Sequence, residues 1–267
     1  MSSSDVQRPI CIIGLGLIGG SLLRDLTECK HSVFGYNHST SGARTAIKQG
    51  YDVTDDLPGI LHRAEAEGAL IVVAVPMEAV GEILDAIAEH APTCGITDVV
   101  SVKTAVYDLI KQRQMETRYV GGHPMAGTSN SGWNNSQTGM FKRAAWAITF
   151  DHAQECEARG ERIGQFWIDL FADVTRMTQM VGAEAVPVTV DNHDAAVARI
   201  SHLPHILAEL LAVVGDNGGI LAQSLASGSF KDGTRVAGTR PELVQQMCET
   251  NAPALVDALD AVSYTHL

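Results

Sequence analysis

Paired cysteines, positive charge and long apolar runs are all scarce in this chain of 267 residues. The five cysteines are scattered and form no CxxC pair, which favours a reducing compartment over disulfides or a zinc site. Asp and Glu outnumber Lys and Arg by 31 to 19, so the net charge is −12. Because a surface that binds phosphate backbones needs clustered Lys and Arg, we expect neither nucleic acid nor an anionic membrane as a partner.

Targeting segments are missing as well. No uninterrupted run of about 18 apolar residues is present, so no transmembrane helix is expected. The N-terminal residues MSSSDVQRP lack the basic start and the apolar stretch of a signal peptide. The sequence therefore predicts a cytoplasmic protein whose partner is a small molecule, which one or two local cations can bind even on an acidic protein.

An alternation of strand and helix fills the first half of the chain. Apolar and β-branched runs predict strands, and periodic segments between them predict helices near 41–49 and 77–90. This alternation predicts an α/β fold with a doubly wound parallel sheet. The predicted strands are PICII (9–13), HSVFGY (31–36), ALIVVAV (69–75), ITDVVS (96–101), RYVGG, AAWAITF and AEAVPV.

The second half of the chain is predicted to be helical. Residues 157–181 have helical periodicity and end at Gly182, and from about 189 onwards no strand pattern returns. We therefore place a domain boundary between residues 1–188 and 189–267. The last segment, PALVDALDAV followed by SYTHL, stops without a helix cap, which is typical of a truncated domain or of residues left by cloning.

The segment Gly14-Leu15-Gly16-Leu17-Ile18-Gly19 fits the GxGxxG pattern. It follows a predicted strand and opens a predicted helix, which is the context that a dinucleotide-binding loop requires. The glycines allow a tight turn and a close approach to the pyrophosphate, and the helix N-terminus offers free N–H groups. The alternative is a glycine-rich turn without a ligand. The predicted cofactor-binding residues are Gly14, Gly16, Leu17, Ile18, Gly19, Asn37, His38, Ser39, Val75 and Pro76.

Asn37 stands where an acidic residue would bind the ribose 2′-hydroxyl of NAD. Asn37, His38, Ser39 and Arg44 could bond a 2′-phosphate, and none of them repels one. This favours NADP slightly over NAD, or tolerance of both. The alternative is that Asn37 is only a turn residue.

Three features of the remaining chain suggest a substrate site. In GGHPMAGTSNSGW (121–133), His123 lies between two glycines and a proline. In the predicted helix after 189, Asp194, Ser201 and His205 fall within about 40° of each other at 100° per residue. Pro204 is expected to kink that helix. The polar stripe faces either a pocket or an interhelical network, and His202 and His205 lack a third ligand for a metal site.

An anion-binding loop rich in glycine and basic residues is predicted at 227–241. It carries Lys231, Arg235 and Arg240, and the planar guanidinium of Arg suits a carboxylate. A solvated surface loop is the alternative interpretation.

Together these segments resemble the prephenate/arogenate dehydrogenase family, also called TyrA. The resemblance spans most of the chain in the family's order. It implies a Rossmann domain, an all-α dimerisation domain like the C-terminal domain of 6-phosphogluconate dehydrogenase, a homodimer, and a substrate cleft between the domains. The matching segments are GLGLIGGS (14–21), DVVSVK (98–103), GGHPMAG (121–127), HDAAVARISHLPH (193–205) and FKDGTRVAG (230–238).

The resemblance also implies oxidative decarboxylation with NAD or NADP, giving tyrosine from arogenate or 4-hydroxyphenylpyruvate from prephenate. His123 would accept the hydroxyl proton and Ser101 would help to orient it. The implied substrate-binding residues are His205, Ser201, Arg235, Lys231, Gly127 and Thr128. Further positions that shape the pocket are Asp232, His193, Asp194 and Ser129.

This sequence departs from the family pattern at Gly233, where many members have a bulkier residue, and at Asn37. The missing acidic residue after the second strand and the lack of fused domains favour arogenate as the substrate and NADP as the cofactor. Two other functions stay open. A reductase of the β-hydroxyacid dehydrogenase type would rely on a helix-borne lysine, which residues 189–217 lack. A nonenzymatic dinucleotide sensor would need neither His123 nor Arg235.

Overall fold

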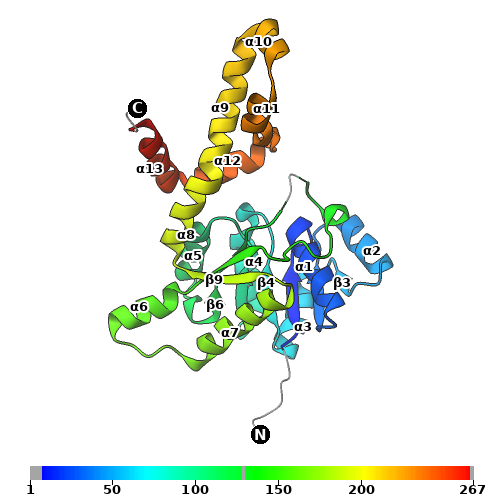
Figure 1. Ribbon diagram of the computed structural model, residues 1–267. Coiled ribbons are helices and arrows are strands. Elements are labelled where there is room, and N and C mark those ends of the chain that lie inside the picture. The colour runs from blue at the N-terminus through cyan, green and yellow to red at the C-terminus, as the bar shows by residue number, and fades with distance from the viewer. Residues whose placement is uncertain (1–7, 128–129, 265–267) are drawn as a thin grey trace. The chain divides into compact units, whose positions relative to one another are not determined.

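The computed structural model describes residues 8–127 and 130–264. It divides into two compact units, residues 1–190 (unit 1) and 191–267 (unit 2) (Figure 1). Every strand within the described residues belongs to unit 1, whereas unit 2 is helical.

A six-stranded parallel sheet with the order β3-β2-β1-β4-β5-β6 forms the centre of unit 1. The chain moves outward from β1 in one direction and from β4 in the other, so the order reverses between these two strands. The predicted α/β fold with a parallel sheet is therefore confirmed. The strands are β1 (Ile10–Ile13), β2 (Val33–Tyr36), β3 (Val53–Thr54), β4 (Leu70–Val73), β5 (Gly95–Asp98) and β6 (Tyr119–Val120).

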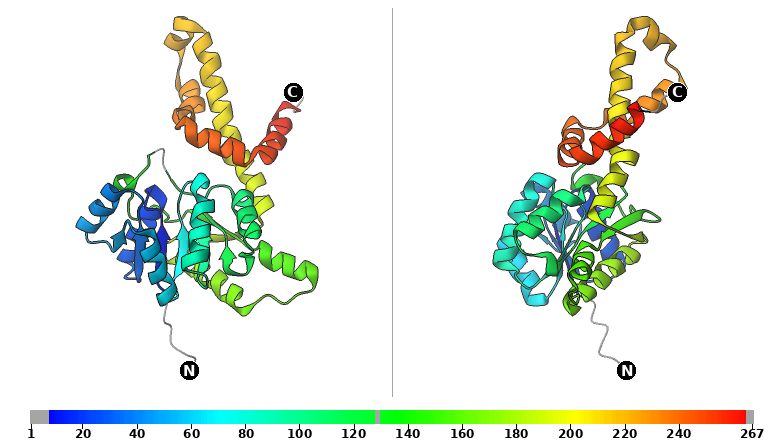
Figure 2. Two further views of the ribbon diagram at one scale, coloured as in Figure 1. Left: turned by 180° about the vertical axis from the view of Figure 1, so that it is seen from behind. Right: turned by 90° about the vertical axis from the view of Figure 1, so that its left-hand side faces the viewer.

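Helices cover both faces of this sheet, as the right-hand view of Figure 2 shows. Alternate residues of β1 point to opposite faces: Cys11 and Ile13 belong to one buried cluster, and Ile10 and Ile12 to another. Because both faces are buried, the strands are continuously apolar. The first cluster includes α3 (Leu57–Glu67), α4 (Met77–His90) and α5 (Lys103–Gln112), and the second includes α1 (Leu17–Glu28), α2 (Thr40–Lys48) and α7 (Gln165–Met180).

A second sheet of three strands lies beyond β6. Strand β7 (Gly122–Pro124) pairs antiparallel with β8 (Ala145–Thr149), which pairs parallel with β9 (Glu184–Val188). The sequence predicted these strands but not a separate mixed sheet. RYVGG contributes only Tyr119–Val120 to the large sheet, since its glycines lead the chain across the end of β5. A Cβ atom on Gly122 would lie 2.7 Å from the carbonyl oxygen of Asp98.

The helix predicted over 157–181 is wrong in its first part. Helix α6 (Asp151–Arg159) ends at Gly160, which has a left-handed φ of 67°, and α7 begins only at Gln165. Glycine in this conformation terminates helices. Two short 3₁₀ helices complete unit 1, η1 (Glu116–Arg118) and η2 (Trp133–Asn135).

Unit 2 is dominated by a helical run over Val190–Asn217. This run consists of α8 (Val190–Val197), a π-helical turn η3 (Ala198–His202) and α9 (Leu203–Asn217). By length and composition it could cross a membrane, and 28% of its most apolar window is buried. The prediction of no transmembrane helix rested on the absence of an uninterrupted apolar run. Isolated charged and polar residues interrupt the apolar residues of this helix.

The remaining elements of unit 2 are α10 (Gly219–Leu225), α11 (Gly228–Thr234), the 3₁₀ helix η4 (Arg235–Gly238), α12 (Pro241–Thr250) and α13 (Ala252–Ser263). Helix α11 lies beside α9 in both figures. The loop predicted at 227–241 is therefore wrong, because most of it is helical. The ring of Phe230 packs against Gly215, where a Cβ atom would lie 2.4 Å from it.

The π-helical turn ends two residues before Pro204, where a kink was predicted. A π turn contains about one extra residue, so it rotates all later side chains by roughly 100° relative to the earlier ones. The expected stripe of Asp194, Ser201 and His205 is therefore broken. Asp194 is buried, whereas Ser201 and His205 are half-buried.

Candidate functional site

A cleft of about 560 Å³ opens at the carboxyl ends of β1, β2 and β4. This is the edge, next to the reversal of strand order, at which α/β sheets bind ligands. The cleft is lined by Gly14–Gly16, by Asn37–Ser39 after β2, by Ser41, Gly42 and Thr45 of α2, by Ala74–Pro76, and by residues 131–135.

The glycine loop has the geometry that a dinucleotide needs. Gly14 has a φ of 104°, and a Cβ atom there would lie 2.5 Å from the carbonyl oxygen of Ala74. Gly16 precedes α1, and a Cβ atom on it would meet nothing within 4 Å. No side chain caps the N-terminus of α1, and its first turn contains no acidic residue. The first N–H groups of α1 can therefore bond a pyrophosphate.

The turn after β2 is held by Asn37, whose side chain is 9% exposed. Its Nδ2 donates to the carbonyl oxygen of Leu15 over 3.3 Å, and its Oδ1 accepts from the N–H of Ser39 over 3.0 Å. Asn37 therefore acts as a turn residue that ties this turn to the glycine loop. Ser39 caps α2, and its hydroxyl lies 2.9 Å from that of Ser41.

A further side of the cleft is formed by residues 131–135, which are distant from the glycine loop in the sequence. The ring of Trp133 is buried, at 4% exposure, while its neighbours Asn134 and Asn135 are exposed. Trp133 is thus a buried anchor of this wall that also contributes to the lining of the cleft.

His123 lies in β7, opposite Ala147 of β8, and is half-buried. Ser101 is exposed and follows β5, the strand that neighbours β6. Ser101 comes three residues after the end of β5, and His123 three residues after the end of β6. Because parallel strands end at the same edge, both residues lie on the edge that carries the cleft.

A buried ion pair supports the segment that carries His123. Lys103 and Asp98 are 0% and 1% exposed and form a direct contact between Nζ and Oδ1. Lys103 Nζ also donates to the carbonyl oxygen of Gly122 over 2.8 Å, and the Tyr119 hydroxyl donates to Asp98 Oδ2 over 2.6 Å. Burial and the adjacent Asp98 carboxylate raise the pKa of Tyr119 well above its ordinary value, so this hydroxyl stays protonated.

In unit 2, the ring of His205 bonds to the π-helical turn. Its Nδ1 donates to the carbonyl oxygen of Ser201 over 2.9 Å, which leaves Nε2 as an acceptor when the ring is neutral. Lys231 lies on α11 and Arg235 begins the 3₁₀ helix η4 that follows it, and both cations are exposed.

A separate polar cluster is buried where α8 meets the π-helical turn. His193 Nδ1 donates to Asp194 Oδ1 over 2.7 Å. The amide of Asn251 donates to the carbonyl oxygen of Asp194 and to His202 Nδ1, over 2.9 and 3.2 Å. The stripe of polar residues is thus divided between a structural network and the half-buried pair Ser201 and His205.

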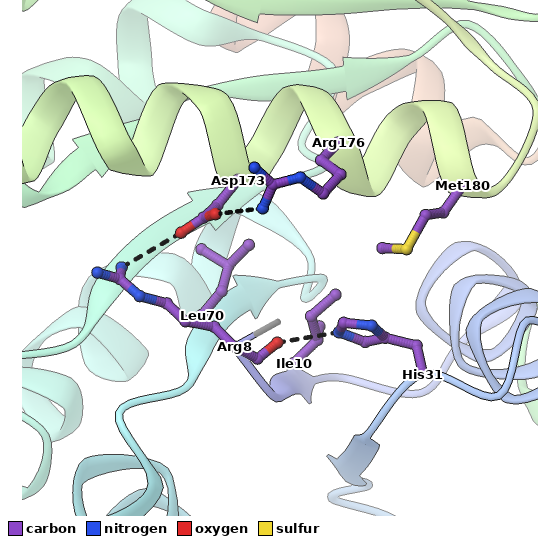
Figure 3. Close-up of a pocket in the computed structure, with 7 residues that line it drawn as sticks. All are labelled: Arg8, Ile10, His31, Leu70, Asp173, Arg176 and Met180. Carbon is purple, nitrogen blue, oxygen red and sulfur yellow. Dashed lines mark hydrogen bonds and ion pairs between the residues drawn. The ribbon is translucent and has the colours of Figure 1, made fainter. Parts of the chain in front are cut away.

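A small pocket of about 20 Å³ lies at the opposite edge of the large sheet (Figure 3). Its residues Ile10 and Leu70 begin β1 and β4. Both of its arginines point to Asp173, with distances of 3.5 Å from Arg8 and 3.0 Å from Arg176. The pocket has room for about one water molecule, and it lies at the amino ends of the strands, so it is not the cofactor site.

The chain matches both domains of one enzyme family. Residues 21–175 match the nucleotide-binding domain of prephenate dehydrogenase, and residues 189–265 match its dimerization domain. The chain belongs to the prephenate dehydrogenase family. It is therefore an NAD(P)-dependent oxidoreductase, and the reaction of this family is an oxidative decarboxylation in tyrosine biosynthesis.

Individual relatives agree with this family. Cyclohexadienyl dehydrogenase of Zymomonas mobilis is 30% identical over 96% of this chain and 85% of its own length. A crystal structure of a proposed prephenate dehydrogenase from Corynebacterium glutamicum is 61% identical, with a TM-score of 0.92 over 97% of this chain and 80% of that one. Arogenate dehydrogenase of Synechocystis is 30% identical, with a TM-score of 0.78 over 96% and 88%. A reductase of the β-hydroxyacid dehydrogenase type and a nonenzymatic sensor are not favoured.

Seven of the ten predicted cofactor-binding residues line the cleft. Those that line the cleft are Gly14, Gly16, Asn37, His38, Ser39, Val75 and Pro76, whereas Leu17, Ile18 and Gly19 do not. Gly127 is exposed, with a φ of 150°, and Thr128 and Ser129 lie outside the described residues. Within the described residues, no group of three or more His, Cys, Asp or Glu could hold a metal ion.

Sequence reasoning missed the residues that support the site. Lys103 is the first of them, although a lysine among Val102, Ala105 and Val106 is a signal for a buried cation. Ser41 and Thr45 could have been found, since their hydroxyls lie in the first turns of α2. Nothing in the sequence connects residues 131–135 with the glycine loop.

Proposed function

We propose that this protein oxidises and decarboxylates a cyclohexadienol that carries a ring carboxylate, as arogenate and prephenate do, with NADP preferred over NAD. The proposal is supported by His123 and Ser101, which follow β6 and β5 at the sheet edge that carries the cleft, although neither residue lines the cleft itself. Oxidising a carbinol requires its O–H proton to leave together with the hydride. A histidine can accept that proton near neutral pH.

Each residue of the proposed site has a separate role in this reaction. His123 takes the hydroxyl proton, and Ser101 orients the hydroxyl and the imidazole. The bound nicotinamide would supply the hydride acceptor. Loss of CO₂ from the ring carboxylate leaves the electron pair that makes the ring aromatic. Ser201, His205, Lys231 and Arg235 bind the substrate; the Arg235 guanidinium suits one of its carboxylates.

The role of His123 is tested by His123→Asn, with His62→Asn as the matched control because His62 is exposed on α3. Initial rates are measured for arogenate and prephenate, each with NADP and NAD, by absorbance at 340 nm. We expect His123→Asn to lower kcat by about 100-fold or more while the Kd for the cofactor changes little. Unchanged kcat would refute the assigned role, and no turnover by the native protein with any of the four pairs would refute the function.

The preference for NADP is supported by the start of α2. Its N-terminus carries the hydroxyls of Ser39 and Ser41, its first turn has no acidic residue, and the neutral Asn37 precedes it. A helix N-terminus that carries hydroxyl groups and no acidic residue favours a 2′-phosphate.

Two substitutions test this preference by adding a carboxylate. Asn37→Asp changes the turn that holds the glycine loop, and Ser41→Asp adds the charge without touching that loop. We expect each to lower kcat/KM for NADP by about tenfold relative to NAD, through charge repulsion of the phosphate. An unchanged NADP to NAD ratio in both variants would contradict the preference.

We further propose that the protein is a cytoplasmic homodimer whose helical unit forms the interface. Unit 2 exposes many large apolar side chains, among them Val213 (59%), Val214 (68%) and Ile220 (84%). Apolar surface of this extent marks an interaction site, and unit 2 matches a dimerization domain. Sedimentation without detergent should show a dimer, and Val214→Glu should shift it towards monomer. A chain that needs detergent to stay in solution would contradict the proposal.

A further inference from the structure

The wall formed by residues 131–135 is anchored by one aromatic contact. The guanidinium carbon of Arg24, on α1, lies 4.3 Å from the centre of the Trp133 ring and 5.1 Å from that of Tyr51. The rings of Tyr51 and Trp133 meet edge to face, with centres 5.3 Å apart. Arg24 is thus stacked against both rings of an aromatic pair, which is a favourable cation–π arrangement.

Hydrogen bonds add direction to this contact. The three guanidinium nitrogens of Arg24 donate to three partners: Nε to Ser136 Oγ over 2.8 Å, Nη1 to the Tyr51 hydroxyl over 3.1 Å and Nη2 to Gln49 Oε1 over 2.9 Å. The indole Nε1 of Trp133 donates to the same Gln49 oxygen over 3.2 Å. Lysine has neither the plane nor the three separated donors, so it cannot replace Arg24 here.

The chain after Trp133 continues along α1. The N–H of Gln137 donates to Ser21 Oγ over 3.0 Å, and the N–H of Gly139 donates to Asp25 Oδ1 over 2.6 Å. A Cβ atom on Gly20 would lie 2.8 Å from the Cβ of Ser136, so the two segments are in close contact. Helix α1 begins at the glycine loop, and Gln49 caps the end of α2. The wall is therefore fixed relative to both the phosphate loop and the ribose turn.

We propose that Arg24 and Trp133 are positioning residues of the cofactor site, which hold residues 131–135 as a preformed wall against the adenosine half of the dinucleotide. The wall shares the cleft with Asn37–Ser39, and the turn after the second strand is where this fold binds the adenosine ribose. Because the wall is already ordered before the ligand binds, the binding free energy does not include the entropy cost of ordering the wall. The inference rests on the proposed use of this cleft by NADP.

The test compares the substitutions Arg24→Ala, Arg24→Lys, Trp133→Ala and Trp133→Phe in the full chain. Arg63→Ala is the matched control, because the Arg63 guanidinium carbon lies 4.0 Å from the centre of the Phe34 ring in the same unit but Arg63 does not line the cleft. The probe is adenosine 2′,5′-bisphosphate, whose Kd is measured by calorimetry. The KM for NADP and the kcat at saturating NADP are measured in parallel.

We expect Arg24→Ala, Arg24→Lys and Trp133→Ala to raise the Kd of the probe and the KM for NADP by about tenfold. The kcat at saturating NADP should stay within about twofold of the native value. Trp133→Phe keeps an aromatic face for Arg24, so it should raise the Kd of the probe and the KM for NADP less than Trp133→Ala does. Arg63→Ala should leave the Kd unchanged.

Three results would overturn the inference. The first is a native Kd for the probe in the folded Arg24→Lys and Trp133→Ala variants, even with a lower melting temperature, since the two residues would then only stabilise the fold. The second is an equal rise in the Kd of the probe in the control variant Arg63→Ala. The third is a fall in kcat without a rise in KM. If the native protein turned over with NADP but did not bind the probe, the placement of the adenosine half would be wrong while the proposed reaction stands.

Discussion

Replacing Lys103 by methionine should destabilise unit 1 more than any surface change. Lys103→Met keeps the length of the side chain but removes its charge, and it leaves Asp98 without its cation. Asp98 is 1% exposed, so its carboxylate cannot recover the lost interaction from water. Its remaining partners are the Tyr119 hydroxyl and the N–H of Val100.

The expected cost follows from this burial. Removing one partner of a buried ion pair costs about 3–5 kcal/mol, because the other charge stays buried and uncompensated. The carbonyl oxygen of Gly122 also loses its donor, which adds to the loss. A domain with a typical total stability of about 5–15 kcal/mol would therefore keep only part of it.

Tryptophan fluorescence measures this effect on unit 1 alone, because the three tryptophans lie at positions 133, 146 and 167. Urea unfolding curves are compared for the native chain, Lys103→Met, Asp98→Asn and the double variant. In the double variant Lys103→Met/Asp98→Asn, the amide at position 98 can still accept from the Tyr119 hydroxyl. The decrease in its free energy of unfolding should therefore be smaller than the sum of the two single decreases by about 2 kcal/mol or more. A loss under about 1 kcal/mol in Lys103→Met, or simple additivity, would refute this account of the pair.

Two further predictions concern groups outside the cleft. Burial lowers the pKa of His202, and its neutral Nδ1 accepts from Asn251, so this group stabilises the fold above its unfolded pKa of about 6.5 and the contribution is lost as the pH falls below that value. Thermal unfolding followed by circular dichroism between pH 5 and 8 should show this loss, and His202→Asn should flatten it; an equal slope in the variant would contradict the assignment. Iodoacetamide should modify the exposed Cys29 in the native state and spare Cys11 and Cys94, because burial raises the pKa of both thiols, that of Cys94 to about 12. Mass spectrometry of the labelled peptides checks this, and early labelling of Cys11 would be inconsistent with the fold.

The large sheet was predictable because its signals are local. Each buried strand, such as Leu70–Val73, is a short apolar run, and the glycine loop follows one strand and opens one helix within a few residues. The break between α6 and α7 was readable at Gly160, but the strong apolar periodicity of 165–180 outweighed it.

The parts that could not be predicted depend on contacts distant in sequence. Trp133, in the segment 131–135 that lines the cleft, contacts Arg24 and Gln49, and no periodicity in the sequence indicates such contacts. The predicted polar stripe on the long helix is wrong for another reason. A projection at 100° per residue assumes an unbroken α-helix, and the π-helical turn at Ala198–His202 violates this assumption.

That turn gives the long helix a property that its length alone does not show. Residues before it supply Asp194 to a buried polar network, and residues after it supply the apolar side chains Val213 and Val214 to the surface. Deleting one residue within 198–202 would restore a regular α-helix, and because the π turn already absorbs one extra residue, the later side chains would keep nearly their present directions. The π turn can therefore lose one residue without changing the side of the helix that a second subunit would meet, whereas a deletion within the regular helix α9 would turn all later side chains by about 100°.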